Sequence, residues 1–275
     1  MTKSIVLLFL LSISTICYSQ SLYTALHMND GKEYKFGRPK QIIEENTFYS
    51  STHTETAKNI KVFDAAGMLL TEERYTQDGI LTAKLTYIND TTRRLKLARI
   101  FERWLKYGRS KEIAVNHYDE HGFLIGSIDS TANGKIIDVT KIVNNSKGDP
   151  IELVLFDANN NPFGKETAEY NYDKNTVVTA VFKNDGTKLS SDTAKIRFTS
   201  ATISEEDKSN YNQYNDAISY STKNSNGSVN LYECEYRYDK TGNWIEQKTY
   251  TITLKSNGKK ERQLNKLFKR EITYR

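Results

Sequence analysis

Apolar and polar residues alternate along much of this chain with a period of two. The clearest example is residues 81–87, where one set of alternate positions holds Leu81, Ala83, Leu85 and Tyr87. The positions between them hold only threonine and lysine. Successive side chains of a β-strand point to opposite faces of a sheet, so this alternation predicts strands with one covered face and one wet face.

A recurring turn signature separates the strand-like segments. An aromatic residue is followed four positions later by glycine in five places and by asparagine in a sixth. The pairs are Phe63 and Gly67, Tyr75 and Gly79, Tyr118 and Gly122, Phe182 and Gly186, Tyr238 and Gly242, and Phe156 and Asn160. Glycine and asparagine enter the left-handed backbone region at the lowest cost, as the last position of a short hairpin loop requires. We therefore expect these glycines to serve the turns and not a reaction.

Aspartate follows the aromatic residue in four of these copies, at Asp64, Asp119, Asp157 and Asp239. A short carboxylate at this position accepts hydrogen bonds from backbone N–H groups within the turn, so we expect the four aspartates to cap turns. Several turn glycines also lie 12 residues apart along the chain. This regular spacing predicts many short strands in one meander.

The turn sequences resemble the YD repeats of RHS-type bacterial surface and secreted proteins. The resemblance rests on YDxxGNW at Tyr238 to Trp244, YDxxG at Tyr118 to Gly122 and FDxxG at Phe63 to Gly67, within residues 60–250. It implies an extended β-sheet that curls into a shell or wraps around carbohydrate or a partner. Because this chain has few copies, we expect an all-β fold: an antiparallel β-meander of repeated hairpins in an open or partly curled sheet. Residues 20–275 are expected to form a single β-repeat domain.

Residues 92–107 interrupt the alternation. Their apolar positions fall at helical spacing among basic residues, at Leu97, Ile100, Phe101, Trp104 and Leu105. The pattern predicts either one short amphipathic helix or a pair of strands in which the tryptophan fills the core, and it leaves both open. If the helix forms, its basic face is expected to be solvated and not to contact a membrane.

Residues 1–19 have the pattern of a secretory signal peptide, with Lys3 before an apolar run and small residues before the expected cleavage point. We therefore expect an exported protein of the periplasm, the cell surface or the medium. A lipid anchor at Cys17 is the alternative, although Ile16 is large for the position before a lipidated cysteine. No later run approaches the roughly 20 apolar residues of a membrane-spanning helix, so we expect no transmembrane span in the mature chain.

Composition narrows the classes of function. Removal of residues 1–19 leaves 256 residues, long enough for one substantial β domain. The formal net charge of +5 is too weak and too mixed to predict binding to nucleic acid. Cys234 is the one cysteine after residue 19, so no internal disulfide is expected. Strand alternation makes it a small buried residue on the face of Tyr232 and Tyr236.

Two motifs suggest metal chemistry, and neither has the context that it needs. His117 to His121 spells HxxEH, which acts on a helix in zinc peptidases, but here it overlaps a predicted turn. Residues 157–161 are similar to the start of a calcium loop, but Pro162 and Ala168 stand where glycine and a bidentate glutamate are required. We therefore expect no enzyme activity, no metal and no cofactor.

The 18 tyrosines favour a binding role. Tyrosine covers apolar surface with its ring while its hydroxyl stays in water, and a row of exposed rings gives sugars a stacking surface. We expect a non-catalytic β-repeat protein of the cell envelope or surface that binds a glycan or a protein partner. The candidate contacts are Tyr232, Tyr236, Tyr238 and Trp244. Two alternatives stay open: a structural or assembly component of an envelope complex, and a zinc hydrolase that uses His117 and His121.

Overall fold

The structure, a computed structural model, describes residues 21–26, 34–195, 210–223, 228–255 and 257–275. The expected signal peptide and Cys17 lie outside the described residues. Within the described ranges, no helix combines the length and the hydropathy that a membrane crossing requires.

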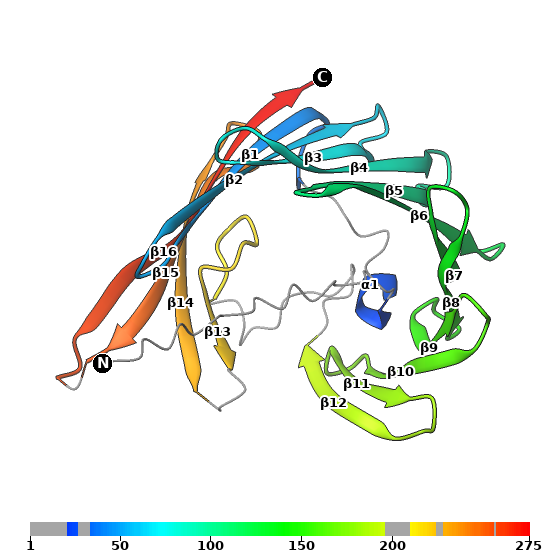
Figure 1. The fold of residues 1–275 in the computed structure, drawn as a ribbon. Helices are drawn as coiled ribbons and strands as arrows, with labels where there is room; N and C mark the ends of the chain where they lie inside the picture. The colour runs from blue at the N-terminus through cyan, green and yellow to red at the C-terminus, as the bar shows by residue number, and fades with distance from the viewer. Residues whose placement is uncertain (1–20, 27–33, 196–209, 224–227, 256) are drawn as a thin grey trace, which may run out of the picture.

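These residues form sixteen β-strands and one short helix (Figure 1). The helix is α1 (Leu22–Leu26). The strands are β1 (Pro39–Tyr49), β2 (Thr54–Phe63), β3 (Leu69–Thr76), β4 (Leu81–Asp90), β5 (Leu95–Leu105), β6 (Gly108–Tyr118), β7 (Leu124–Thr131), β8 (Ile136–Asn144), β9 (Pro150–Asp157), β10 (Pro162–Asn171), β11 (Thr176–Lys183), β12 (Lys188–Lys195), β13 (Ser219–Lys223), β14 (Val229–Tyr238), β15 (Trp244–Leu254) and β16 (Lys260–Tyr274).

All sixteen strands belong to one antiparallel sheet, which confirms the predicted all-β meander of hairpins. Strands β1 to β12 follow one another across the sheet in chain order, and β16 to β13 continue from the other side of β1. The first and last strands of the chain are therefore neighbours, with Ile42 opposite Ile272 and Glu44 opposite Arg270. β12 and β13 are the two edges, and within the described residues they do not pair with each other.

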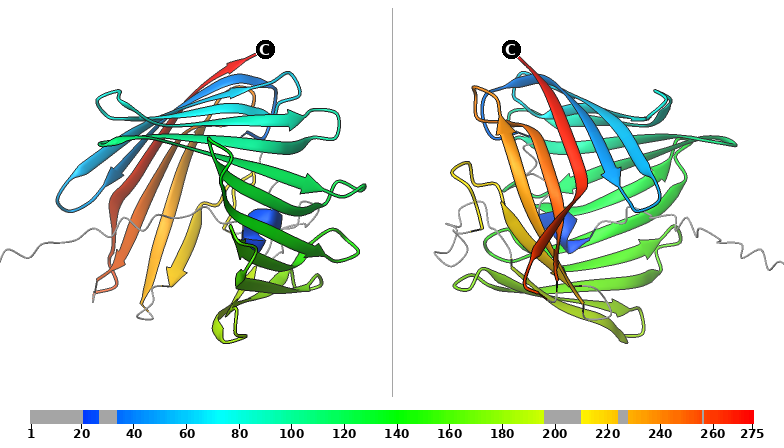
Figure 2. Two further views of the ribbon diagram at one scale, coloured as in Figure 1. Left: turned by 45° about the vertical axis from the view of Figure 1, so that its right-hand side comes forward. Right: turned by 90° about the vertical axis from the view of Figure 1, so that its left-hand side faces the viewer.

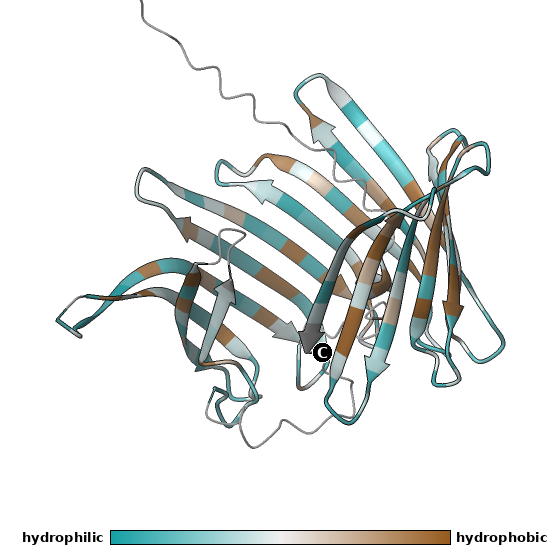
Figure 3. Cartoon of the chain, turned by 90° about the horizontal axis from the view of Figure 1, so that it is seen from below, coloured by the Kyte–Doolittle hydropathy of each residue, from teal (hydrophilic) through white to brown (hydrophobic). Residues whose placement is uncertain are grey.

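The sheet is curled, and α1 lies on its inner side (Figure 1, Figure 2). We call this side the inner face and the opposite side the outer face. Hydrophobic and hydrophilic positions alternate along the strands in Figure 3, as the period of two requires. The curl is consistent with the twist between neighbouring strands and with β-bulges in the ladders, such as the register shift between His117 and Tyr118.

The helix considered for residues 92–107 is wrong, and the strand alternative is right, because β5 occupies most of this segment and pairs with β6, which follows it. Phe101 is buried on the inner face in a cluster with Ala83 and Leu85, whereas Ile100 faces outward. The apolar residues thus lie on both faces of one strand, and their combined spacing along the sequence resembles that of a helix. Trp104 does not fill the core as expected, because it is half-buried with the Arg109 guanidinium 4.8 Å from its ring centroid.

Two further hydrophobic clusters lie on the inner face. In the first, Leu22 of α1 is buried against Leu124, Ile142 and Leu153 of β7, β8 and β9. The backbone N–H of Leu22 also donates to Glu166 Oε2 at 2.9 Å. Burial of one leucine side chain contributes roughly 1.5–3 kcal/mol, so this contact holds α1 on the sheet. The second cluster consists of Tyr34, Ile42, Phe63 and Leu69.

A buried ion cluster lies where β1 meets β16. Glu44 of β1 is 6% exposed, and its carboxylate contacts Lys61 Nζ of β2 at 3.0 Å. On the other side, Arg270 Nε of β16 donates to Glu44 Oε1 at 2.6 Å. Burial alone would raise the pKa of Glu44, but the charges and hydrogen bonds of Arg270 and Lys61 hold that pKa below its ordinary value. One carboxylate therefore ties three neighbouring strands together.

The turns at the two ends of the sheet differ in their surroundings. Gly67, between β2 and β3, has φ +79°, and a Cβ there would overlap the hydroxyl of Tyr34. At the opposite end, Gly79 has φ +77°, and no atom lies within 4 Å of the corresponding Cβ position. We call these ends the packed rim and the open rim. The packed rim also holds Gly122, Gly148 and Gly242, and the open rim holds Gly134, Gly186 and Gly258.

Replacement of Gly67 by alanine is expected to destabilise the protein more than Gly79→Ala does. Both changes place a Cβ on a left-handed residue at a cost of roughly 1–2 kcal/mol. Only at Gly67 must Tyr34 also move, which breaks its hydroxyl bond to Gly67 O and disturbs its edge contact with Phe63. We expect a further loss of about 1–2 kcal/mol in the free energy of unfolding, measured by urea denaturation. Equal losses in the two variants would contradict the difference between the rims.

Glu44→Gln is expected to lower the free energy of unfolding by about 3 kcal/mol, because it removes the buried negative charge that both Lys61 and Arg270 contact. Glu45→Gln is the control, since Glu45 is exposed on the outer face. The folded-state pKa of Glu44 is lowered, so its contribution is present above the unfolded-state pKa and is lost as the pH falls through the folded-state pKa. The difference between wild type and Glu44→Gln in urea denaturation should therefore shrink in acid. A variant as stable as Glu45→Gln at neutral pH would show that the cluster is not needed.

Candidate functional site

The repeated turns use their aspartates as backbone caps. In the turn after β6, Asp119 Oδ1 accepts the backbone N–H of His121 at 3.0 Å and that of Phe123 at 2.8 Å. The residues Asp64, Asp157 and Asp239 each accept backbone N–H groups within their own turns. The predicted turn glycines, Gly67, Gly79, Gly122, Gly186 and Gly242, have φ between +77° and +95°. All nine residues thus shape hairpins, and the aspartate oxygens that cap the turns are occupied by the backbone.

The HxxEH segment lies in a strand and a turn, not in a helix. His117 is in β6, and His121 is in the turn that follows. The His121 imidazole is 3.5 Å from Glu120 Oε1, and both side chains are largely exposed. Within the described residues, no three histidine, cysteine, aspartate or glutamate side chains gather as they would around a metal ion. The structure therefore does not provide the helical context that the zinc-peptidase motif needs.

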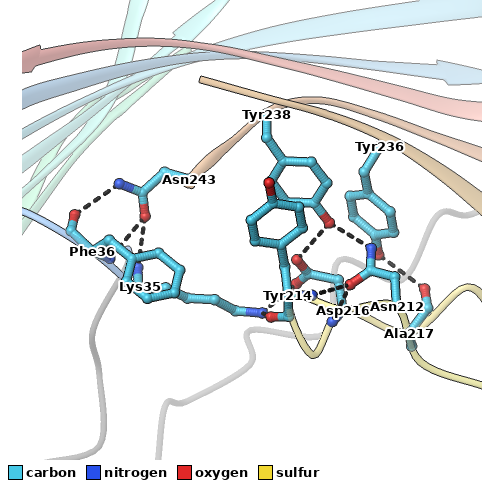
Figure 4. Close-up of polar contacts among 9 residues, drawn as sticks. All are labelled: Lys35, Phe36, Asn212, Tyr214, Asp216, Ala217, Tyr236, Tyr238 and Asn243. Atoms are coloured by element: carbon cyan, nitrogen blue, oxygen red, sulfur yellow. Dashed lines mark hydrogen bonds and ion pairs between the residues drawn. The ribbon is translucent and has the colours of Figure 1, made fainter. Parts of the chain in front are cut away.

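Tyr236 and Tyr238 of β14 hold the segment that precedes β13 (Figure 4). The Tyr238 hydroxyl donates to Asp216 Oδ2 at 2.8 Å and accepts from Asn212 Nδ2 at 2.6 Å. Its ring stacks on Tyr214 with 3.9 Å between centroids. The Tyr236 hydroxyl donates to the backbone carbonyl oxygen of Ala217 at 3.1 Å. Burial raises the pKa of both tyrosines, so both hydroxyls stay protonated as donors.

Asn243 fixes the chain before β1 against the same region. Its Oδ1 accepts the backbone N–H of Lys35 at 2.8 Å and that of Phe36 at 3.0 Å. Its Nδ2 donates to Phe36 O and to the Tyr274 hydroxyl, each at 2.7 Å. Asn243 is 2% exposed. The side chain of Lys35 in turn forms an ion pair with Asp216, with 2.7 Å between Nζ and Oδ1. The β14–β15 turn thus contacts two segments that are distant in the sequence, the chain before β1 and the end of β16.

Three of the four predicted ligand contacts are engaged inside the protein. Tyr236 and Tyr238 anchor the segment before β13. Trp244 is covered by Arg270, whose guanidinium lies 3.4 Å from the ring centroid. The structure brings these rings to one region, but it does not present them as an exposed row.

Tyr232, the fourth predicted contact, stacks on Tyr220 of the edge strand β13. Their centroids are 4.8 Å apart, and Tyr220 is 39% exposed. Both tyrosines contribute to the lining of a hollow of about 440 Å³. Strand alternation places the rings of Tyr220 and Tyr232 on the inner face, whereas Ser219 and its cross-strand partner Glu233 point to the outer face. The hollow therefore has its polar side chains on the outer face. Its polar lining includes Ser219, Ser221, Glu233 and Lys260.

Sequence analysis missed two copies of the turn. Asn212 Oδ1 accepts two backbone N–H groups of its turn, and Asn215 has φ +62°. Tyr211 precedes Asn215 by four positions, so the signal was present with asparagine in place of aspartate and glycine. The second copy begins at Asn145, which caps the turn that contains Gly148 and lacks the aromatic residue.

Comparison with known proteins gives no family assignment. No protein-family model matches the chain, and no curated protein matches it. The resemblance to YD repeats of RHS-type proteins therefore stays a prediction.

Solved structures show only distant likeness. A porin-like protein from Bacteroides uniformis has 11% identity and a TM-score of 0.46, with 86% of this chain and 98% of that chain covered. The Tc holotoxin pore of Photorhabdus luminescens has 12% identity and a TM-score of 0.19, and the match spans 76% of this chain and 15% of that chain. The MucA/MucB complex of Pseudomonas aeruginosa has 9% identity and a TM-score of 0.14, and the match covers 91% of this chain and 92% of that chain. No functional property follows from likeness at these levels.

Asn243→Ala is expected to release the chain before β1. The substitution removes four hydrogen bonds and leaves part-buried backbone groups of Lys35 and Phe36 without the partner that Asn243 supplies, at about 2–4 kcal/mol of unfolding free energy. Limited proteolysis should then cleave the chain at residues 34–38 faster than in wild type. Asn161→Ala is the matched control, because Asn161 occupies the same slot of its turn on the open rim and is exposed. Wild-type protection of this segment in Asn243→Ala would refute the anchoring role.

Proposed function

We propose that this chain is a non-catalytic, exported protein of the cell envelope or surface that binds a glycan at the Tyr220–Tyr232 pair. The observation that carries the proposal is a stacked aromatic pair that is accessible through Tyr220 on the edge strand β13, in a region where the neighbouring aromatic residues are engaged internally. Sugar rings stack their C–H faces on aromatic rings, and sugar hydroxyls hydrogen-bond to polar side chains.

The other parts of this proposal rest on separate observations. Export is supported by the signal-peptide pattern of residues 1–19. A non-catalytic role is supported by the position of HxxEH in a strand and a turn, and by the turn aspartates, which bind their own backbone. The Tyr220–Tyr232 pair lies at the edge of the described sheet, where an extended ligand can approach without passing through the protein.

A glycan array followed by calorimetric titration of the best ligand tests the proposal on residues 20–275. Tyr220→Ala and Tyr232→Ala are each expected to weaken binding by about tenfold, because an aromatic stacking contact contributes about 0.5–1.5 kcal/mol beyond its buried area. Tyr107→Ala is the control, since Tyr107 is 91% exposed in the turn between β5 and β6. The ligand should be recovered chemically unchanged after incubation.

Two outcomes would overturn this assignment. One is the absence of any retained glycan on the array. The other is a ligand that binds both tyrosine variants as tightly as wild type, because the site would then lie elsewhere. Thermal unfolding of each variant establishes that it is folded before binding is compared.

An assembly role is the second candidate, and the two sheet edges that no described strand covers favour it. β12 and β13 each present a row of backbone N–H and C=O groups that another strand can pair with. Size-exclusion chromatography with light scattering distinguishes the two candidates. A monomer at all concentrations supports the binding protein, whereas oligomers that grow with concentration support the assembly component.

A further inference from the structure

Two aspartates face each other on the inner side of the β7–β8 hairpin. Asp129 of β7 is directly opposite Asp138 of β8, and the next pair on the same face is Ser127 opposite Thr140. Asp138 is 8% exposed, Ser127 2% and Thr140 1%. Among the described residues, no group hydrogen-bonds to Asp138 Oδ1, Ser127 Oγ or Thr140 Oγ1. The pair therefore lies in a buried polar patch with little solvation.

The charged groups around the pair do not neutralise both carboxylates. β5 contributes Arg99, whose charge favours the ionised form of Asp129. β6 contributes Glu112, whose charge has the opposite effect and which is itself bonded to Arg103 of β5. From β9, Asp157 stands opposite Asp138 in the register, at the exposed start of a turn. The charges of Arg99 and Glu112 thus act on the two facing carboxylates in opposite directions.

Electrostatics opposes the ionisation of both acids. Burial raises the pKa of Asp129 to about 7, the negative charge of Asp138 adds to this shift, and Arg99 opposes it. Burial also raises the pKa of Asp138. Two carboxylates in contact hold one proton between them over a wide range of pH, because the second ionisation must work against the first charge.

The same two strands contribute to the surface on which α1 packs, which we call the seat of α1. Leu124 of β7 and Ile142 of β8 are buried against Leu22 in the first hydrophobic cluster. Ile142 lies on the face of Asp138, four residues further along β8. A change in the pairing of β7 with β8 therefore alters the surface that Leu22 of α1 packs against.

We propose that Asp129 and Asp138 share one proton and act as a pH-sensitive latch on the β7–β8 hairpin, which holds the seat of α1 closed when protonated and loosens it when both acids ionise. The folded state then retains a proton that the unfolded chain, with ordinary aspartates, has already lost. Stability from this source is fully present below the unfolded-state pKa and is lost as the pH rises through the folded-state pKa, so the window runs from about pH 4 to about pH 7.

The test measures thermal unfolding and hydrogen exchange of residues 20–275 between pH 5 and pH 8. The unfolding midpoint is expected to fall by at least about 5 °C over this range. The protection factors of α1 amides, corrected for the intrinsic effect of pH, are expected to fall about tenfold at the upper end, from the opening that a loosened seat allows.

Asp129→Asn and Asp138→Asn separate the pair from other titrating groups. An amide can donate to the remaining carboxylate at any pH, so each variant is expected to fold and to lose most of the pH dependence of both readouts. Glu169→Gln is the control, because Glu169 is an exposed acid of β10 and should leave the wild-type dependence unchanged. A wild-type midpoint that is constant from pH 5 to pH 8 would overturn the proposal. So would full wild-type pH dependence in both asparagine variants.

Discussion

The pairing of β1 with β16 joins two series of hairpins into one sheet. β1 has one neighbour from the adjacent hairpin, and its other neighbour is the last strand of the chain. Glu44 makes the register of this pairing specific, because a shift by one residue would turn its carboxylate to the outer face. Lys61 and Arg270 would then lose the buried carboxylate that both contact, at a cost of several kcal/mol.

The turn positions could be predicted from the sequence because their cause is local. The left-handed conformation of Gly67 and the capping by Asp64 depend on residues within the same turn. The turns at Asn145 and Asn212 use the same chemistry with different residues, and were missed for that reason. Residues 92–107 were ambiguous because their apolar residues lie on both faces of a strand, and only the pairing with neighbouring strands resolves this.

The candidate site could be predicted only in part, because exposure depends on contacts between distant residues. Tyr232, Tyr236 and Tyr238 occupy equivalent alternate positions of one strand, so the sequence does not distinguish them. The structure distinguishes them because Tyr238 meets Asp216, which is bound by Lys35 from 181 positions away. The stacking partner of Tyr232 comes from the edge strand β13, and no local pattern relates the two.

The position of β1 between β2 and β16 also has a consequence for biosynthesis. Hairpins from β2 to β12 can close one after another as the chain leaves the ribosome, since each needs only its predecessor. β1 keeps one side bare until residues 260–274 have been made, and contacts across such a separation form slowly. The interval between synthesis of the first strand and synthesis of the last is therefore when this chain is most liable to aggregate.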